Sequence, residues 1–336
     1  MRLEKFGQVA AMRITDNALN VLAAKTYRGI GKAWIVKNLK GNESEAKVVA
    51  LLRQGAKEGG GVSMEEFEER KQSIRNLLEQ VAGVVHGVVA VGDSYFPLYR
   101  GVVKNSERPV ALFYRGDIRL LEVENKNIAV VGLLDPDEDT VVFEELVVSG
   151  LVNHGATIVS GLALGCDTVA HKRALVSGGK TVAILPGPIT DILPRSNQGL
   201  AEEIVQNGGL LVTEYYKRAK SRMEMSGRYQ ERDRLQALFS DCVVLSASYA
   251  KNSLGNDSGS RHAMNYARSY SISRAVMYDG TLSADNPRYD LNRQLIREDG
   301  DIVVISRGNV QEVLEEILSG HDDSRGDNYV QGHLFE

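Results

Sequence analysis

Residues 157–171 read TIVSGLALGCDTVAH, and this stretch decides the fold that the sequence predicts. It begins with a short β-branched and apolar run at 157–159, which is typical of a strand buried on both faces of a sheet. Glycines at 161 and 165 then mark a loop, and a helical pattern follows from Thr168. A buried strand, a glycine-rich loop and a helix are the parts of a βαβ crossover, so we expect a parallel α/β sheet.

The same alternation recurs on both sides of this stretch. Helical patterns at 143–153, 168–176 and 200–206 separate apolar runs that are candidate strands. Repeated strand–helix units predict an α/β fold, an extended Rossmann-like, doubly wound and mostly parallel sheet, over residues 125–318. The further candidate strands lie at 128–131, 181–185, 210–212, 242–245, 275–277 and 302–305.

The rest of the chain divides into three further parts. Residues 1–85 follow a mostly helical pattern and predict a small N-terminal helical domain. Its turn at Gly29 and Gly31 resembles a helix-hairpin-helix, although a tight interhelical turn also explains it. Residues 86–124 predict a lead-in extension of the sheet domain, and the polar residues 319–336 predict a disordered tail.

The composition excludes several classes of protein. Of 336 residues, 43% are hydrophobic and 25% are charged, which is typical of a globular protein and argues against intrinsic disorder. The net charge of −4 restricts any polyanion site to a local basic patch. We find no signal peptide, no apolar run of the ~18 residues that a membrane helix needs, and two widely separated cysteines. We therefore expect a cytoplasmic protein with no membrane partner, no disulfide framework and no zinc site.

The loop after the first predicted strand, residues 132–140, reads GLLDPDEDT. It lacks the Gly-x-Gly-x-x-Gly pattern of NAD-binding proteins, and its carboxylates would repel a phosphate. Its Asp-x-Asp-x-Asp spacing resembles a calcium loop, but Thr140 and Leu146 stand where such a loop has glycine and glutamate. We interpret it as a solvated acidic loop and predict neither a cofactor nor a metal.

Two loops rich in glycine and serine are candidate anion sites. Each precedes a predicted helix, and the unpaired N–H groups of a helix N-terminus favour negative charge. Ligands of open α/β sheets bind beyond the carboxyl ends of the strands, where these loops are expected. Glycines that only serve the turn would give the same pattern. The candidate residues are Ser160, Gly161 and Gly165 in one loop and Ser258, Gly259 and Ser260 in the other.

The stretch from Tyr216 to Arg234 is the most basic in the chain. It holds seven lysines and arginines against three acidic residues, a balance of +4. Tyrosines interleaved with arginines suit the bases of single-stranded nucleic acid, although a solvated surface loop would have the same composition. No Gly-x-Ser-x-Gly, His-Glu-x-x-His or Walker loop accompanies it, so we expect a binding protein and not an enzyme. The candidate DNA contacts are Lys217, Arg218, Arg222, Arg228, Arg232 and Arg234.

Taken in order, several stretches resemble the DNA-processing protein A family, also called DprA or Smf. The resemblance implies a homodimer that binds single-stranded DNA without sequence preference, helps to load RecA recombinase and has no catalytic activity. By position, it implies that Arg232 and Arg234 hold backbone phosphates, with Gly161, Gly165 and residues 258–260 lining the same pocket. The similar stretches are 93–98, 109–116, 159–175, 178–185, 193–197, 209–214, 229–240 and 258–260.

The chain departs from the family's pattern at several positions. The family's Gly-Ser-Arg after the first strand is GLL at 132–134, and the usual basic residue of the next loop is Leu164. A proline and an asparagine of the family's arginine motif are Gln230 and Asp233. Loss of positive charge predicts weaker DNA binding at physiological salt. We therefore expect a divergent member without a C-terminal winged helix, serving a mobile element or a phage-defence locus.

The end of the chain predicts a second kind of partner. Gln331, Leu334 and Phe335 resemble the short peptide by which bacterial proteins dock on the replication sliding clamp. Two other functions stay open. One is a nucleotide-binding or nucleotide-hydrolysing Rossmann protein, although residues 185–188 (LPGP) lack the phosphate loop of such enzymes. The other is a regulatory, antidote or sensor subunit that binds a cognate effector protein.

Overall fold

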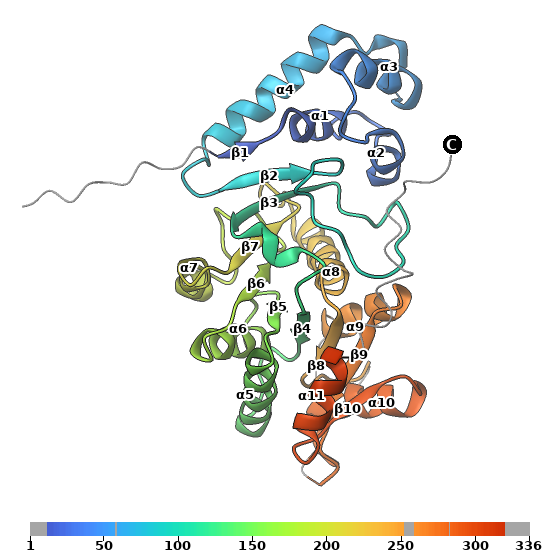
Figure 1. The fold of residues 1–336 in the computed structure, drawn as a ribbon. Helices are drawn as coiled ribbons and strands as arrows, with labels where there is room; N and C mark the ends of the chain where they lie inside the picture. The colour runs from blue at the N-terminus through green and yellow to red at the C-terminus, as the bar shows by residue number, and fades with distance from the viewer. Residues whose placement is uncertain (1–11, 58, 252–258, 282, 320–336) are drawn as a thin grey trace, which may run out of the picture. The chain divides into compact units, whose positions relative to one another are not determined.

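The computed structural model of the chain describes residues 12–57, 59–251, 259–281 and 283–319 (Figure 1). Ser258 and the tail residues Gln331, Leu334 and Phe335 therefore lie outside the described residues. The chain forms two compact units. Unit 1 comprises Met1–Phe96, Lys104–Arg115 and Glu214–Tyr216, and unit 2 comprises Pro97–Val103, Gly116–Thr213 and Lys217–Glu336.

The described part of unit 1 is helical with a small sheet. Thr15, Ser44 and Ser63 each begin a helix by accepting a hydrogen bond from the N–H three residues along the chain. In the sheet, β1 runs parallel to β2, and β2 runs antiparallel to β3. The elements are β1 (Arg13–Ile14), α1 (Asp16–Ala24), α2 (Lys32–Asn38), α3 (Glu45–Gly55), α4 (Met64–Glu79), β2 (Gly87–Ala90) and β3 (Ala111–Gly116), with a 3₁₀ turn at Gly59–Gly61.

The described part of unit 2 contains a sheet of parallel strands in the order β7-β6-β5-β4-β8-β9-β10. From β4 the chain proceeds outward to β7 and then returns to β8 on the other side of β4. This reversal creates a switch point at the carboxyl end of β4, where open α/β sheets bind their ligands. The strands are β4 (Asn127–Val131), β5 (Thr157–Ser160), β6 (Thr181–Ile184), β7 (Leu210–Thr213), β8 (Cys242–Leu245), β9 (Ser273–Met277) and β10 (Val303–Ile305).

Helices cover both faces of this sheet, which confirms the predicted doubly wound α/β fold. Figure 1 shows α5 and α6 on one side of the strands and α8 and α9 on the other. On the first side, Phe143, Val147 and Leu314 pack with buried strand residues such as Ile128 and Val244. The helices are α5 (Glu138–Asn153), α6 (Cys166–Val176), α7 (Gln198–Gln206), α8 (Arg222–Leu238), α9 (Gly259–Ser269), α10 (Asp290–Glu298) and α11 (Val310–Ser319), with 3₁₀ turns at Ile118–Leu121, Arg195–Asn197 and Pro287–Tyr289.

Two elements differ from the patterns read in the sequence, each for a local reason. Helix α5 begins at Glu138 and not at 143, because the Asp137 carboxylate caps it and accepts the N–H of Thr140 at 3.0 Å. One carboxylate of the acidic loop is thus a helix cap. The basic stretch is not a surface loop, because from Arg222 onward it forms α8, which begins at the Ser221 cap. Among the described helices, none is long and apolar enough to cross a membrane.

Candidate nucleic-acid interface

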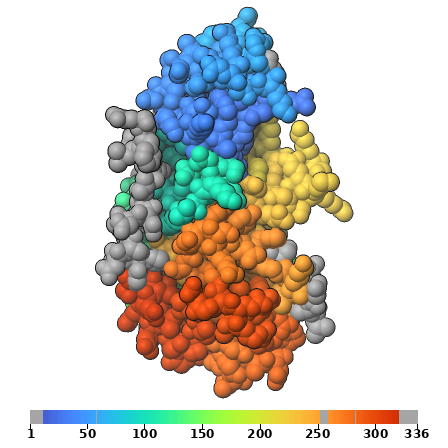
Figure 2. Space-filling model, turned by 90° about the vertical axis from the view of Figure 1, so that its right-hand side faces the viewer, coloured from blue at the N-terminus to red at the C-terminus, as the bar shows by residue number. Residues whose placement is uncertain are grey.

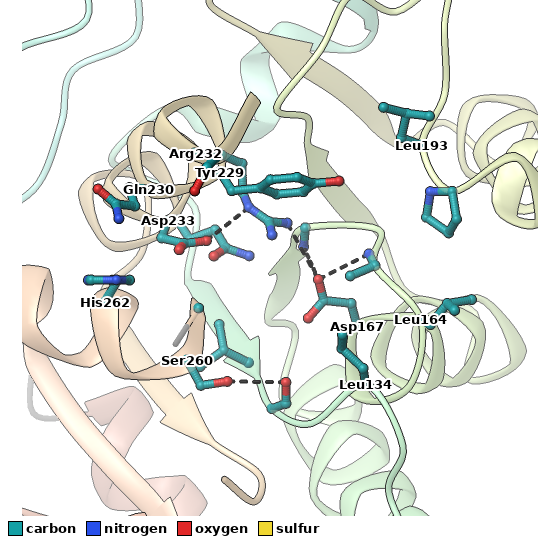
Figure 3. A pocket seen from close by; sticks show the side chains of 18 residues that line it. Leu134, Leu164, Asp167, Leu193, Tyr229, Gln230, Arg232, Asp233, Ser260 and His262 are labelled. Carbon is teal, nitrogen blue, oxygen red and sulfur yellow. Dashed lines mark hydrogen bonds and ion pairs between the residues drawn. The ribbon is translucent and has the colours of Figure 1, made fainter. Parts of the chain in front are cut away.

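A pocket of about 580 Å³ lies in unit 2 at the carboxyl ends of β4 and β5 (Figure 3). We call it the sheet-edge pocket. The loops after these two strands form one wall, and α8 and the start of α9 form the other. Leu193 and Pro194, from the segment that follows β6, complete the lining. The Ser260 hydroxyl donates to the Gly132 carbonyl at 3.1 Å and so fixes α9 to the loop after β4.

Asp167 organises the loop after β5. Its side chain lies in the first turn of α6 and points back along the chain, where its Oδ2 accepts the N–H groups of Gly161 and Ala163, each at 3.1 Å. Gly165 is the cap of α6, and its positive φ of 69° and close approach to the Leu133 carbonyl leave no room for a side chain. The loop that was predicted to bind an anion therefore already holds a carboxylate from its own chain.

Arg232 lies buried between two carboxylates. Its Nη1 is 3.5 Å from Asp167 Oδ2, and its Nε is 3.0 Å from Asp233 Oδ1. The guanidinium passes directly over Gly161, where a Cβ would lie 1.2 Å from Nη1. Glycine at this position is therefore required for the Arg232–Asp167 ion pair to form. The requirement for glycine comes from this packing and not from the approach of a phosphate.

The interior of the sheet-edge pocket carries no surplus of positive charge. Among the lining residues that the structure describes, the two carboxylates outnumber the guanidinium of Arg232. Burial raises the pKa of Asp167, and the nearby charge of Arg232 opposes that rise. His171, behind the pocket in α6, is buried against Thr181, and burial together with Arg232 lowers its pKa to about 3. It is therefore neutral at physiological pH and contributes no cation.

Apolar side chains surround the mouth of the pocket. Leu134 is 61% exposed, Leu164 is 48% exposed and Tyr229 is 39% exposed. Figure 3 shows the Tyr229 ring beside the Arg232 guanidinium, extending toward Leu193. The distance from the ring centroid to Arg232 Cζ is 5.8 Å, a weak cation–π contact. The two leucines that replace basic residues of the family pattern are thus on the rim of the pocket.

A second, smaller pocket of about 260 Å³ adjoins the first and shares Leu193 with it. We call it the arginine pocket, because Arg218 and Arg222 line it. Arg218 forms an exposed ion pair with Asp191 at 2.9 Å. Arg222 is exposed on the first turn of α8 and has no ion-pair partner within the described part of the chain. Positive charge that is available to a ligand therefore lies outside the sheet-edge pocket.

The predicted contacts do not all lie together. Gly161, Arg232, Gly259 and Ser260 line the sheet-edge pocket, whereas Arg218 and Arg222 line the arginine pocket. Ser160 is buried and donates to the Val130 carbonyl, and Gly165 is the cap of α6. Arg228 pairs with Glu224 and Arg234 with Glu231, and both arginines are buried. Five of the predicted contacts that the structure describes line neither pocket: Ser160, Gly165, Lys217, Arg228 and Arg234.

Sequence reasoning missed several lining residues. Asp167, Leu193, Gln236 and His262 contribute to the sheet-edge pocket but were not singled out. A signal for Asp167 was available, because an acidic residue in the first turn of a helix can accept N–H groups of the preceding loop. For Leu193 no such local signal exists, since it comes from a segment after a different strand.

Comparison with known proteins supports one family. The sequence model of the family described as DNA recombination-mediator protein A matches residues 87–317. DNA processing protein DprA of Streptococcus pneumoniae is 38% identical over 109 residues, which make up 32% of this chain and 37% of that protein. The aligned part is thus little more than a third of that relative's length.

Two solved structures are also similar. The X-ray structure of DNA processing protein A from Streptococcus pneumoniae has a TM-score of 0.65 and 22% identity, covering 89% of this chain and 97% of that one, which shows a shared fold. DNA processing protein A from Helicobacter pylori, described as having a unique single-stranded DNA binding mode, has a TM-score of 0.53 and 25% identity, covering 67% of this chain and 98% of that one.

Proposed function

Because the chain belongs to the DNA recombination-mediator protein A family, the DprA/Smf family that its motifs resemble, we propose that it binds single-stranded DNA along the carboxyl edge of the unit 2 sheet. The observation that carries this proposal is the arrangement of the two adjoining pockets. Exposed cations line one of them, and an exposed aromatic ring stands at the mouth of the other. Cations that follow a backbone beside aromatic platforms for bases are the general means of binding single strands.

In this proposal the exposed cations of the arginine pocket hold backbone phosphates. Arg222 can do so directly, and Arg218 can exchange Asp191 for a phosphate, because an exposed ion pair contributes only ~0–1 kcal/mol. Lys217 is exposed just before α8 and extends the same cationic segment. The contacts are to phosphates and not to base edges, so binding is independent of sequence.

The buried arginines have a different part in the proposal. Arg228 reaches back from α8 to the Lys217 carbonyl at 2.6 Å and pairs with Glu224, so it orders the segment that carries Arg218. Arg232 shapes the sheet-edge pocket together with Gly161 and Ser260. Arg234 is buried and holds Glu231, and it supports α8 from inside the unit.

The test is fluorescence anisotropy with a labelled single-stranded oligonucleotide across a salt series. We compare wild type with an Arg218→Ala/Arg222→Ala variant and with a Lys172→Ala/Arg297→Ala control, which removes two exposed cations of unit 2 that line neither pocket. Each lost phosphate contact lowers the salt slope by ~0.7 for a single strand, so the first variant should lose ~1.4 and bind more weakly.

The control should bind as wild type does, because Lys172 and Arg297 line neither pocket. The two variants have the same net charge, so a difference between them cannot come from net charge. If both variants weaken binding equally, the contacts are not localised at the arginine pocket. If wild type does not bind the oligonucleotide, the proposed function fails.

The proposal extends to a homodimer that delivers the strand to RecA recombinase. The description of the family as recombination mediators supports this part. Light scattering after gel filtration should give twice the mass of one 36.8 kDa chain. With a strand coated by single-strand-binding protein, the chain should shorten the lag of the RecA ATPase, and the Arg218→Ala/Arg222→Ala variant should not. An unchanged lag with wild type would contradict the delivery role.

A further inference from the structure

We propose that Lys32, in the helical hairpin of unit 1, is a positioning residue for the binding of single-stranded DNA. Through an ion pair with Glu214 it holds in place the start of residues 217–222, which carry the cations assigned to backbone phosphates. This inference rests on the proposed function. It gives the hairpin turn at Gly29 and Gly31, which the proposed function leaves unused, a part in DNA binding that requires no contact with DNA.

Lys32 supplies positive charge to a buried carboxylate. It is the first residue of α2, and its Nζ lies 3.3 Å from Oε1 and 3.4 Å from Oε2 of Glu214. The side chain of Glu214 is 2% exposed and that of Lys32 is 18% exposed, so solvent and salt screen the pair only weakly. A buried carboxylate requires positive charge or hydrogen-bond donors beside it. Lys32 therefore stabilises Glu214 in the position that it occupies directly after β7.

Glu214 lies just before the residues that are proposed to hold phosphate. Residues 214–216 belong to unit 1, and the chain continues into unit 2 at Lys217. Within unit 1, the ring of Tyr216 packs on Phe113 of β3, with 5.2 Å between the ring centroids. Two residues separate Glu214 from Lys217, so a displacement of Glu214 also displaces the start of the next segment. We call residues 217–222 the cationic segment, because it holds Lys217, Arg218, Lys220 and Arg222.

The cationic segment is held by a few attachments and not by burial. Lys217, Arg218 and Lys220 are exposed, and Figure 2 shows the yellow part of the chain that contains them projecting from the surface. Within unit 2, Arg228 donates to the carbonyls of Lys217 and Arg218, at 2.6 and 3.5 Å. A segment that is ordered before it binds loses less conformational entropy on binding. Loss of the attachment at Glu214 should therefore weaken DNA binding although no phosphate contact is removed.

Two substitutions separate positioning from direct contact. In Lys32→Ala the buried carboxylate of Glu214 loses a neighbouring cation, and its charge then favours movement toward water. In Lys32→Ala/Glu214→Gln the side chain at 214 is uncharged and can stay buried at a smaller cost. Affinity for DNA should thus fall in the single variant and return in the double variant. If Lys32 contacted a phosphate, the second substitution would not restore binding.

The experiment combines fluorescence anisotropy with hydrogen–deuterium exchange. A labelled deoxythymidine strand is titrated across a salt series, and the exchange of peptides that cover 214–222 is followed in the free proteins. The proteins are wild type, Lys32→Ala and Lys32→Ala/Glu214→Gln. Two controls match their charges: Lys37→Ala removes an exposed cation of the same helix, and Lys32→Ala/Glu79→Gln removes an exposed carboxylate of α4 in place of Glu214.

We expect Lys32→Ala to bind ~5- to 30-fold more weakly, which corresponds to the cost of ordering about one residue, with the salt slope of wild type. Its peptides at 214–222 should exchange faster. The Glu214→Gln substitution should restore both properties and Glu79→Gln neither, while Lys37→Ala behaves as wild type does.

Three results would overturn the inference and leave the proposed function intact. The first is wild-type affinity and exchange in Lys32→Ala. The second is a salt slope that falls by ~0.7, which would make Lys32 itself a phosphate contact. The third is a loss of affinity that Glu214→Gln does not restore, or faster exchange throughout unit 1. Failure of wild type to bind the strand overturns both the inference and the proposed function.

Discussion

Substitution of Gly161 by alanine tests how the sheet-edge pocket is built. A Cβ at this position would lie 1.2 Å from Arg232 Nη1, 2.3 Å from its Cζ and 2.7 Å from Asp167 Oδ2. These atoms belong to a buried ion pair and not to the free end of a flexible side chain. The methyl group can be accommodated only if the guanidinium moves away from Asp167, so the variant should lose both packing and the ion pair.

The expected loss of stability follows from these two effects. Overpacking of a well-packed interior costs ~1–3 kcal/mol. Loss of a hydrogen bond to a charged group costs ~1.5–3 kcal/mol. Because movement of the guanidinium relieves part of the clash, the two costs overlap. We therefore expect the free energy of unfolding to fall by ~2–4 kcal/mol.

Urea denaturation followed by far-ultraviolet circular dichroism measures this change. Gly227→Ala is the matched control, because a Cβ at 227 meets nothing within 4 Å and the residue lies inside α8. There alanine should stabilise the protein by ~0.5–1 kcal/mol. If Gly161→Ala unfolds at the same urea concentration as wild type, Arg232 does not occupy the space above Gly161 and this description of the pocket is wrong.

Three further predictions concern other residues of unit 2. Burial raises the pKa of Glu144 to about 8, against 4.5 in the unfolded chain, so the folded protein keeps this carboxyl protonated. As pH rises from 5 to 8, wild type should therefore lose a few kcal/mol of stability relative to Glu144→Gln. Urea titrations measure this, and parallel stability curves for the two proteins would refute it. Burial lowers the pKa of His171 to about 3, so below pH 6.5 the unfolded chain gains a proton that the folded chain does not. From pH 6.5 toward 3, the stability of wild type should therefore fall more steeply than that of His171→Gln. Equal slopes of stability against pH would show that the imidazole becomes charged without unfolding. Asp137→Ala removes the cap of α5, so it should lower the free energy of unfolding by ~0.5–2 kcal/mol and with it the thermal unfolding midpoint. Asp135→Ala, at an exposed position of the same loop, should leave the midpoint unchanged. Equal effects of the two substitutions would assign the loss to charge rather than to capping.

Much of the fold could be predicted from the sequence because its strands are buried on both faces. A strand such as β5 (Thr157–Ser160), whose residues are all buried, is then built of apolar or small side chains, and the glycines after it mark the turn into α6. Element ends were harder to place. The start of α5 depends on one capping carboxylate, and the acidic loop that supplies Asp137 was interpreted as solvated.

The site could be predicted only in part. The ordered motifs placed Gly161, Arg232 and Ser260 in one pocket, and the structure brings these three together. The sequence does not show that Arg232 pairs with Asp167, because 65 positions separate them and only the packing of α8 against the sheet joins them. By contrast, the pairing of Arg234 with Glu231 follows helical i, i+3 spacing and was available from the sequence. The sequence cannot show which arginines are buried. Burial separates the arginines that a DNA strand can reach from those that it cannot.

The most direct test of DNA binding at this edge of unit 2 is photochemical crosslinking. A single strand that carries 5-iodouracil is irradiated with the protein, and the crosslinked peptides are identified by mass spectrometry. We predict a crosslink at Tyr229, because its exposed ring stands at the mouth of the sheet-edge pocket. The crosslink should disappear in Tyr229→Ala and persist in Met223→Ala. Crosslinks confined to peptides of unit 1 would contradict the account.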